Sequence, residues 1–238
     1  MPFIPGYPNN PSGAWSNGNF DNLTISLNAT HPSNKLTEYY LHNLYGHMMS
    51  KVVFTNNQGM DDSKTNLRKF SLSRSTFPSS GMYTSHSLGE NLRTWEHLKY
   101  SIAGVMSMNM FGIPHVGADV CGYSASKQDE ELCARWYQLS TFYPFARYNQ
   151  NDKLIGGGAD PQHEPFSLSG LWGEMAQASV KTRYNYLRHY YTCLFEVTQW
   201  GGTCVDPTFF FYPQDDNLHN DYQANFMVGN AILVTPVT

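Results

Sequence analysis

The sequence predicts an α/β fold built from parallel strand–helix units and followed by a short all-β segment. Short apolar runs alternate with longer runs of helical periodicity through most of the 238 residues. About four such steps are present, half of the number in an eight-stranded β/α barrel, which typically takes about 250 residues. After Gly201-Gly202 the pattern changes to short apolar alternation, which indicates β structure.

The first third of the chain is predicted to form a loop, a helix, a second loop and a strand. Residues 1–34 are rich in Pro, Gly, Asn and Ser, so we expect an extended surface loop. Residues 36–48 carry apolar side chains every three or four positions, which predicts a helix. Residues 56–65 are polar and predict a loop, and residues 69–73 predict a strand that ends at Arg74.

The middle third is predicted to contain two helices around a buried strand. Residues 94–110 place Trp95 and Leu98 on one helical face, and residues 113–118 form a short apolar strand. Ser126 is a candidate N-cap for the next helix. Acidic residues follow where the helix dipole favours negative charge; they are Asp129, Glu130 and Glu131.

The last third is predicted to begin with a strand at residues 142–147 and a loop at residues 153–165. Three successive glycines lie in this loop, but no Lys-Ser or Lys-Thr follows them, so we reject a phosphate-binding loop. Residues 173–199 predict one long amphipathic helix. The apolar runs 208–211 and 231–234 are predicted to be strands.

The composition argues against several classes of function. Charged residues make up 14% of the chain and the net charge is −4, so nothing indicates nucleic acid or an anionic membrane surface as a partner. The longest uncharged run, between Lys99 and Asp119, approaches the ~20 residues of a membrane helix. It contains Pro114, His115 and three glycines. We therefore expect no membrane span.

Two carboxylates follow predicted strands and precede predicted helices. Glu90 comes after the strand that ends at Arg74, and Asp119 closes the next strand. In a β/α barrel, catalytic residues gather at this end of the strands. We expect Arg74, Glu90, Asp119 and Arg147 to meet there. The structural alternatives are a charge that stabilises a helix N-terminus, for Glu90, and ion pairs for the other three.

This stretch resembles glycoside hydrolase family 31, the α-glucosidase family. The matching motifs are Arg74-Ser75-Thr76-Phe77, Gly89-Glu90-Asn91, Phe111-Gly112-Ile113-Pro114, Val116 to Gly122, and Phe142-Tyr143-Pro144-Phe145. They occur in the family's order along residues 36–238. The resemblance implies an extended barrel loop at residues 1–34 and the C-terminal half of a (β/α)8 TIM barrel at residues 35–200. It places the first strands of a β-sandwich domain at residues 201–238.

The resemblance also implies a retaining exo-α-glucosidase that removes terminal α-linked glucose without a metal or cofactor. In retaining enzymes one carboxylate attacks the anomeric carbon and a second serves as acid and then base. Glu90 lies at the acid/base position. The family's nucleophile is an Asp in a Trp-x-Asp-Met-Asn-Glu motif, which we expect upstream of this chain, so the chain alone would not complete the reaction. The expected sugar-binding residues are Arg74, Asp119, Tyr123, Arg147 and Asn149.

Four positions depart from the family pattern. Glu90 stands where the family has Asp, and a carboxyl misplaced by ~1 Å can lose about a hundredfold in rate. Ser87, Asn149 and Tyr123 replace the family's Trp, His and Phe. Two hypotheses follow: an active glucosidase, or a catalytically impaired member that serves as a glycan-binding or structural subunit. A Ser/His/Asp hydrolase is disfavoured because residues 122–126 lack the final Gly of a nucleophile elbow.

The cysteines and the N-glycosylation patterns bear on the cellular compartment. The resemblance implies a disulfide between Cys121 and Cys133, whereas pairing of Cys193 with Cys204 stays open; zinc is not expected without a Cys-x-x-Cys. Acceptor patterns at Asn22 and Asn28 indicate a secretory route, although such patterns also arise by chance. Residues 1–6 do not resemble a signal peptide, as expected for an internal fragment.

We therefore expect a lysosomal or extracellular location within the secretory pathway. The expected partners are an oligosaccharide or glycan substrate and the remainder of the parent chain, namely the N-terminal barrel half and the β-sandwich domains. We expect no nucleic-acid partner.

Overall fold

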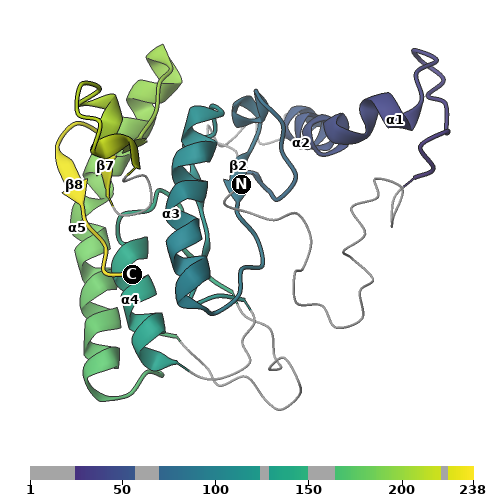
Figure 1. The fold of residues 1–238 in the computed structure, drawn as a ribbon. Coiled ribbons are helices and arrows are strands. Elements are labelled where there is room, and N and C mark those ends of the chain that lie inside the picture. The colour runs from purple at the N-terminus through teal and green to yellow at the C-terminus, as the bar shows by residue number, and fades with distance from the viewer. Residues whose placement is uncertain (1–24, 57–69, 124–128, 150–163, 221–224) are drawn as a thin grey trace, which may run out of the picture.

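The chain forms part of an α/β barrel (Figure 1). The structure is a computed structural model that describes residues 25–56, 70–123, 129–149, 164–220 and 225–238. The barrel strands are β1 (Leu72–Ser73), β2 (Ser85–Ser87), β3 (Val116–Gly117), β4 (Asp119–Val120) and β5 (Arg147–Tyr148). β1, β2 and β3 pair in parallel in chain order, and β4 pairs in parallel with β5. Only Ala118 separates β3 from β4, so the parallel strands from β1 to β5 lie in chain order.

The predicted strands of the parallel part are present but shorter than expected. The run at residues 113–118 becomes two strands of two residues each, and the run at 142–147 reaches its strand only at Arg147. β2 is not among the predicted strands, because Ser85-His86-Ser87 has neither apolar alternation nor β-branched residues. Glu90 therefore follows β2, and the strand that ends before Arg74 is β1.

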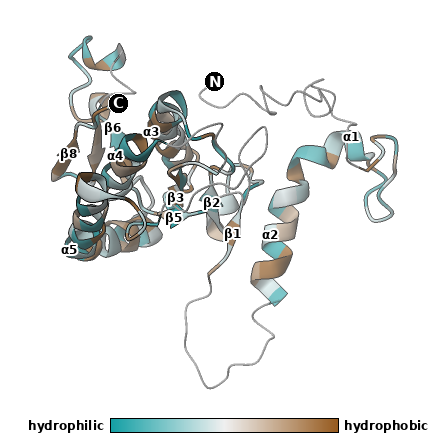
Figure 2. Cartoon of the chain, turned by 90° about the horizontal axis from the view of Figure 1, so that it is seen from below, coloured by the Kyte–Doolittle hydropathy of each residue, from teal (hydrophilic) through white to brown (hydrophobic). Residues whose placement is uncertain are grey.

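The helices lie on two sides of the strands. They are α1 (Glu38–Leu41), α2 (Tyr45–Asn56), α3 (Trp95–Met110), α4 (Glu130–Ser140) and α5 (Gly170–Trp200), and a 3-10 turn, η1 (His42–Leu44), joins the first two. A further 3-10 turn, η2 (Ser80–Met82), precedes β2. Figure 2 shows α3, α4 and α5 together on one side of the strands and α2 on the other.

The starts of α3 and α4 are set by side-chain caps. Thr94 accepts a hydrogen bond from the backbone N–H of His97 (3.2 Å) and begins α3. Asp129 accepts one from the backbone N–H of Leu132 (2.9 Å) and begins α4. The prediction of Ser126 as the cap of α4 is therefore wrong. Two acidic residues still lie in the first turn of α4.

The core lies between the strands and α3–α5. Trp136 is fully buried, and the buried hydroxyl of Tyr143 pairs with Oγ of Ser101 (2.7 Å). Arg183 of α5 donates to the carbonyl oxygens of Ser140 (2.8 Å) and Pro144 (3.0 Å). The bond to Ser140 satisfies a carbonyl group in the last turn of α4, and the bond to Pro144 fixes α5 against the segment that enters β5.

The C-terminal segment is an antiparallel sheet joined to α3. Its strands are β6 (Val205–Pro207), β7 (Phe226–Val228) and β8 (Ile232–Val234), paired in chain order. Two 3-10 turns, η3 (Thr208–Phe210) and η4 (Leu218–Asn220), lie between β6 and β7. The predicted strand at residues 208–211 is therefore wrong, because its apolar run packs as a helical turn. The run at 231–234 does form β8.

Both cysteine pairs are disulfides. Cys121 is bonded to Cys133, and Cys193 is bonded to Cys204, which ties α5 to the entry of β6. Within the described ranges, no helix combines the length and hydrophobicity needed to cross a membrane. The same ranges contain no cluster of three or more His, Cys, Asp or Glu side chains arranged for a metal ion.

Candidate active site

Asp119 is the buried centre of the site. It begins β4, and its side chain is only 1% exposed. Arg147 donates from Nη2 to Oδ1 (3.2 Å), and Asn149 donates from Nδ2 to Oδ2 (3.2 Å). Arg147 lies in β5 and is the register partner of Asp119 in the parallel pair, and Asn149 directly follows β5. Burial raises the pKa of Asp119, the two donors oppose this rise, and the negative charge of Glu90 adds to it.

Arg74 links this centre to Glu90. Its side chain lies against the backbone of Gly89, where a Cβ would overlap Nε and Cδ of Arg74. Gly89 also has φ +89°, a conformation that side-chain-bearing residues rarely adopt. Desolvation lowers the pKa of the Arg74 guanidinium, and the charges of Glu90 and Asp119 oppose the change. The charge of Arg74 therefore interacts with those of Glu90 and Asp119, and the charge of Asp119 also interacts with that of Arg147.

Glu90 itself is exposed, in contrast to the residues beside it. Ser87, Leu88, Gly89 and Asn91 are all buried. Oγ of Ser87 accepts a hydrogen bond from the backbone N–H of Gly89 (3.3 Å). The small, buried Ser87 thus stabilises the turn that carries Glu90.

His86 is a buried imidazole that sequence reasoning did not identify. It is 2% exposed, and its Nδ1 shares a hydrogen bond with Oγ1 of Thr76 (3.0 Å). Its Nε2 has no hydrogen-bond partner among the described residues. Burial, with the nearby charge of Arg74, lowers the pKa of His86 to about 4. The imidazole is therefore neutral at physiological pH.

Asn91 and Arg93 form a second group that the sequence did not single out. The Asn91 amide bonds the backbone of Asp119, and Nε of Arg93 donates to the carbonyl oxygen of Cys121 (2.9 Å). Tyr123, a predicted sugar-binding residue, donates its backbone N–H to the carbonyl oxygen of Asn91 (2.7 Å). The signal in the sequence that pointed to Asn91 was its place in the family motif Gly89-Glu90-Asn91.

The two predicted glycosylation sites differ in what can be said of them. Asn22 lies outside the described residues. Asn28 is exposed and sits in a turn in which the backbone N–H of Ala29 donates to the carbonyl oxygen of Ser26 (2.9 Å).

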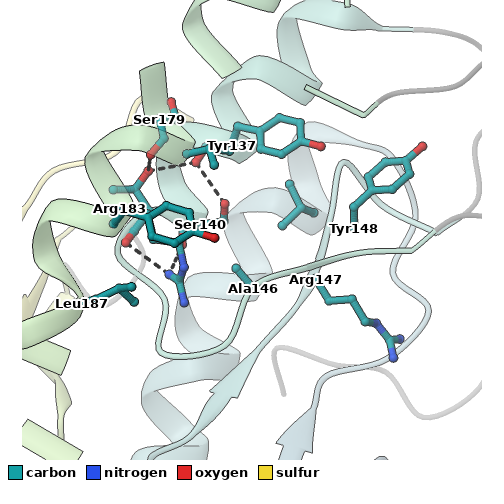
Figure 3. Close-up of a pocket in the computed structure, with 12 residues that line it drawn as sticks. Tyr137, Ser140, Ala146, Arg147, Tyr148, Ser179, Arg183 and Leu187 are labelled. Carbon is teal, nitrogen blue, oxygen red and sulfur yellow. Dashed lines mark hydrogen bonds between the residues drawn. The ribbon is translucent and has the colours of Figure 1, made fainter. Parts of the chain in front are cut away.

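A cavity of about 280 Å³ lies beside this site, between α4, α5 and β5 (Figure 3). Arg147 belongs to its lining, whereas Asp119 and Glu90 do not. In Figure 3 the Arg147 guanidinium points away from the group around Arg183. Polar groups of the lining are bonded to the protein itself, as in the bond from Oγ1 of Thr141 to the carbonyl oxygen of Ser179 (3.1 Å). The cavity is therefore bordered mainly by α4, α5 and the segment that leads into β5, and the two carboxylates lie outside its lining.

The arrangement can perform proton transfer next to a recognition carboxylate. An exposed carboxyl group, Glu90, can exchange protons with a bound molecule. Asp119, whose charge interacts with that of Glu90, has further lone pairs that can accept hydrogen bonds from hydroxyl groups. The charge of Arg74 interacts with both carboxylates.

Comparison with known proteins identifies similar chains. A family model described as the glycosyl hydrolases family 31 TIM-barrel domain matches residues 9–193. An alpha-glucosidase of Mucor javanicus is 39% identical over 224 residues, which is 92% of this chain and 24% of that protein. An uncharacterised family 31 glucosidase of Schizosaccharomyces pombe is 39% identical over 220 residues, 92% of this chain and 21% of that protein.

Solved structures agree with these relatives. The glucosidase II alpha subunit, crystallised with Tris, superposes with a TM-score of 0.82 at 27% identity, over 91% of this chain and 22% of that one. A heterodimeric ER glucosidase II complex, which contains a catalytic subunit and the binding domain of a regulatory subunit, gives a TM-score of 0.81. The chain spans less than a quarter of the length of the relatives named here.

Proposed function

Because the chain belongs to glycoside hydrolase family 31, we propose that it is part of a retaining exo-α-glucosidase-like enzyme that removes terminal α-linked glucose. The observation that carries the proposal is the buried Asp119 carboxylate, which pairs with Arg147 and interacts with the charges of Arg74 and Glu90. Glu90 serves as the acid and then the base, and the nucleophile is an Asp upstream of this chain.

Asp119 binds hydroxyl groups of the terminal sugar. Each carboxylate oxygen can accept two hydrogen bonds, and Arg147 and Asn149 occupy one on each oxygen. The carboxylate is covered in this structure, but the Arg147 side chain is 43% exposed and can turn outward to uncover Oδ1. Arg74, Tyr123, Arg147 and Asn149 complete the sugar-binding set.

A second candidate is a catalytically impaired member that binds glycans or supports an assembly. The replacement of the family's Asp by Glu90 and of its Trp by Ser87 favours this candidate. A longer carboxylic acid would sit about one bond length from its usual place, and a hydroxymethyl group cannot form an aromatic wall. Misplacement of the carboxyl group weakens transition-state geometry, and loss of the aromatic wall removes a contact with the sugar.

Hydrolysis of p-nitrophenyl α-glucoside by the protein expressed from its complete coding sequence distinguishes the two. For an enzyme, Glu90→Gln lowers kcat by about 10²- to 10⁴-fold, the usual contribution of general acid–base catalysis. Glu96→Gln, an exposed Glu on α3, is the matched control and leaves kcat unchanged. Absence of activity across sugars and pH, with glycan binding retained, supports the impaired member. Inversion of the product anomer contradicts the retaining mechanism.

We further propose the domain organisation and compartment. Residues 35–200 form the C-terminal barrel half, and residues 201–238 form the first strands of a β-sandwich domain; the loop predicted at residues 1–34 lies mostly outside the described residues. Exposed apolar faces on α2 and α5, which include Met49 and Tyr191, support contact with the remainder of the parent chain. An upstream Trp-x-Asp-Met-Asn-Glu motif in the coding sequence would support the half-barrel assignment, and its absence would contradict the upstream nucleophile.

The proposed location is the secretory pathway, either lysosomal or extracellular. Two disulfides and the exposed Asn28 turn support it, since disulfides persist mainly in oxidising compartments. Mass spectrometry of tryptic peptides from protein made in its native host tests this. A glycan on Asn28 supports the secretory route, and reduced cysteines with an unmodified Asn28 contradict it.

A further inference from the structure

We propose that Asn91 is a positioning residue that fixes Glu90 relative to Asp119. This inference rests on the proposed function, in which those two carboxyl groups act on one sugar. Asn91 directly follows Glu90 and is 5% exposed. Its Oδ1 accepts a hydrogen bond from the backbone N–H of Asp119 (3.0 Å), and its Nδ2 donates to the carbonyl oxygen of Asp119 (3.1 Å).

These two side-chain bonds extend the hydrogen-bonded ladder between β2 and β3 beyond the ends of both strands. β2 ends at Ser87, and just beyond it the backbone N–H of Leu88 donates to the carbonyl oxygen of Gly117 (2.9 Å). The chain then turns through Gly89 toward α3. Asp119 lies two residues after Gly117. There the side-chain amide of Asn91, in place of a backbone peptide group, pairs with both the N–H and the carbonyl oxygen of Asp119. These bonds fix the position of the loop that carries Glu90 relative to β4.

Further contacts close the same junction. The carbonyl oxygen of Asn91 accepts from the backbone N–H of Tyr123 (2.7 Å), and Nε of Arg93 donates to the carbonyl oxygen of Cys121 (2.9 Å). Gly122 lies so close to the backbone of Arg93 that a Cβ there would overlap its nitrogen. Cys121, held by its disulfide to α4, has φ +68°. Asn91 is the residue of this junction that is next to Glu90.

Loss of the amide should move Glu90 more than Asp119. Asp119 stays paired to β5 and bonded to Arg147, whereas Glu90 is exposed and depends on its backbone for placement. Sugar binding through Asp119 should therefore survive while proton transfer suffers. A displacement of ~1 Å lowers rates about a hundredfold. The expected result is a fall in kcat with little change in KM.

Asn109 provides a matched control. It is 1% exposed, and its Oδ1 accepts from the backbone N–H groups of Cys204 (2.9 Å) and Val205 (3.0 Å). It is thus an equally buried amide that also bonds a distant strand backbone, but it joins α3 to β6, away from the carboxylates. Asn109→Ala should destabilise the fold without touching the placement of Glu90.

The experiment compares Asn91→Ala with Asn109→Ala in the protein expressed from its complete coding sequence. We expect Asn91→Ala to lower kcat on p-nitrophenyl α-glucoside by about 10- to 100-fold with KM within about threefold of the wild type, and Asn109→Ala to keep both within about threefold. Equal kcat losses in the two variants, or a KM increase as large as the kcat loss, would overturn the proposal.

Amide hydrogen exchange gives a readout that does not depend on hydrolysis. The Asp119 N–H should exchange at least about tenfold faster in Asn91→Ala and at the wild-type rate in Asn109→Ala. If the wild type does not hydrolyse the substrate, the proposed enzyme function fails and this comparison alone decides the role of Asn91. Unchanged exchange would overturn it. If Asn91→Ala does not fold, Asn91→Leu, which is similar in size but has neither the acceptor nor the donor, carries the same expectations.

Discussion

Acidification should destabilise this protein through His86, because the fold holds that imidazole neutral. Burial and the charge of Arg74 lower its pKa from 6.5 to about 4. The unfolded chain therefore takes up a proton at higher pH than the folded chain. The stability that the neutral imidazole contributes is complete above pH 6.5 and is lost as the pH falls from 6.5 to about 4.

The size of the effect follows from the two pKa values. A lowering from 6.5 to about 4 corresponds to about 3 kcal/mol over the whole pH range, at 1.36 kcal/mol for a tenfold change in proton affinity. About 2 kcal/mol of this is already lost at pH 5. The side chain is 2% exposed, so solvent screens the effect little.

Urea unfolding of the wild type and of His86→Asn at pH 7 and pH 5 measures this loss. The wild type should lose about 2 kcal/mol more than the variant between the two pH values. Burial also lowers the pKa of His97 and His115, but their contributions cancel in the comparison. Parallel pH dependences for the wild type and His86→Asn would refute the reasoning.

Three further predictions test other parts of the fold. Burial raises the pKa of Asp119 above 3.8, so the melting temperature of Asp119→Asn should rise relative to the wild type as the pH increases from 3 to 7; parallel melting curves would contradict this. Gly117→Ala should lower the free energy of unfolding by about 2–4 kcal/mol, because the added Cβ would overlap a backbone carbonyl group. Gly112→Ala should lower it by only about 1–2 kcal/mol, because Gly112 lies in open space and only its φ of +81° disfavours a side chain. Equal losses in denaturant titrations of the two variants would argue against the contact at Gly117. Cys133→Ala should lower it by about 3 kcal/mol through loss of the bridge to Cys121, and a loss below about 1 kcal/mol would show that the bridge contributes little.

The long helices were predictable from the sequence, whereas the strands were predictable only in part. α3 and α5 have enough turns for their periodicity to be read, and each begins and ends within three residues of its predicted bounds. The barrel strands have two or three residues each, too few for alternation to show. β2 is the clearest case, because its polar residues join the sheet through neighbours on both sides.

The errors near the C-terminus have a tertiary origin. β6 contains Asp206 and Pro207, which are poor strand formers, and it is placed by the Asn109 amide of α3, about a hundred residues earlier in the chain. The neighbouring apolar run at 208–211 looked more like a strand but turns instead. Local propensity was overridden here by a contact that the sequence does not display.

The sequence predicted the positions of the site but not the contacts within it. The strand-end rule and the family motifs predicted that Arg74, Glu90, Asp119 and Arg147 meet, and the structure shows the ion pair between Asp119 and Arg147. They did not indicate that Asp119 would be covered, because its burial depends on side chains from β5. The contacts of Asn91 and His86 were also hidden, since each joins segments ten or more residues apart.

A crystal structure of the protein expressed from its complete coding sequence, with glucose bound, would show whether Asp119 and Glu90 act on one sugar. We expect a carboxylate oxygen of Asp119 to accept a hydrogen bond from a sugar hydroxyl and the Glu90 carboxyl to lie beside the anomeric oxygen. Glucose bound instead in the gap between α4 and α5, or a Glu90 carboxyl directed away from the sugar that Asp119 holds, would contradict it.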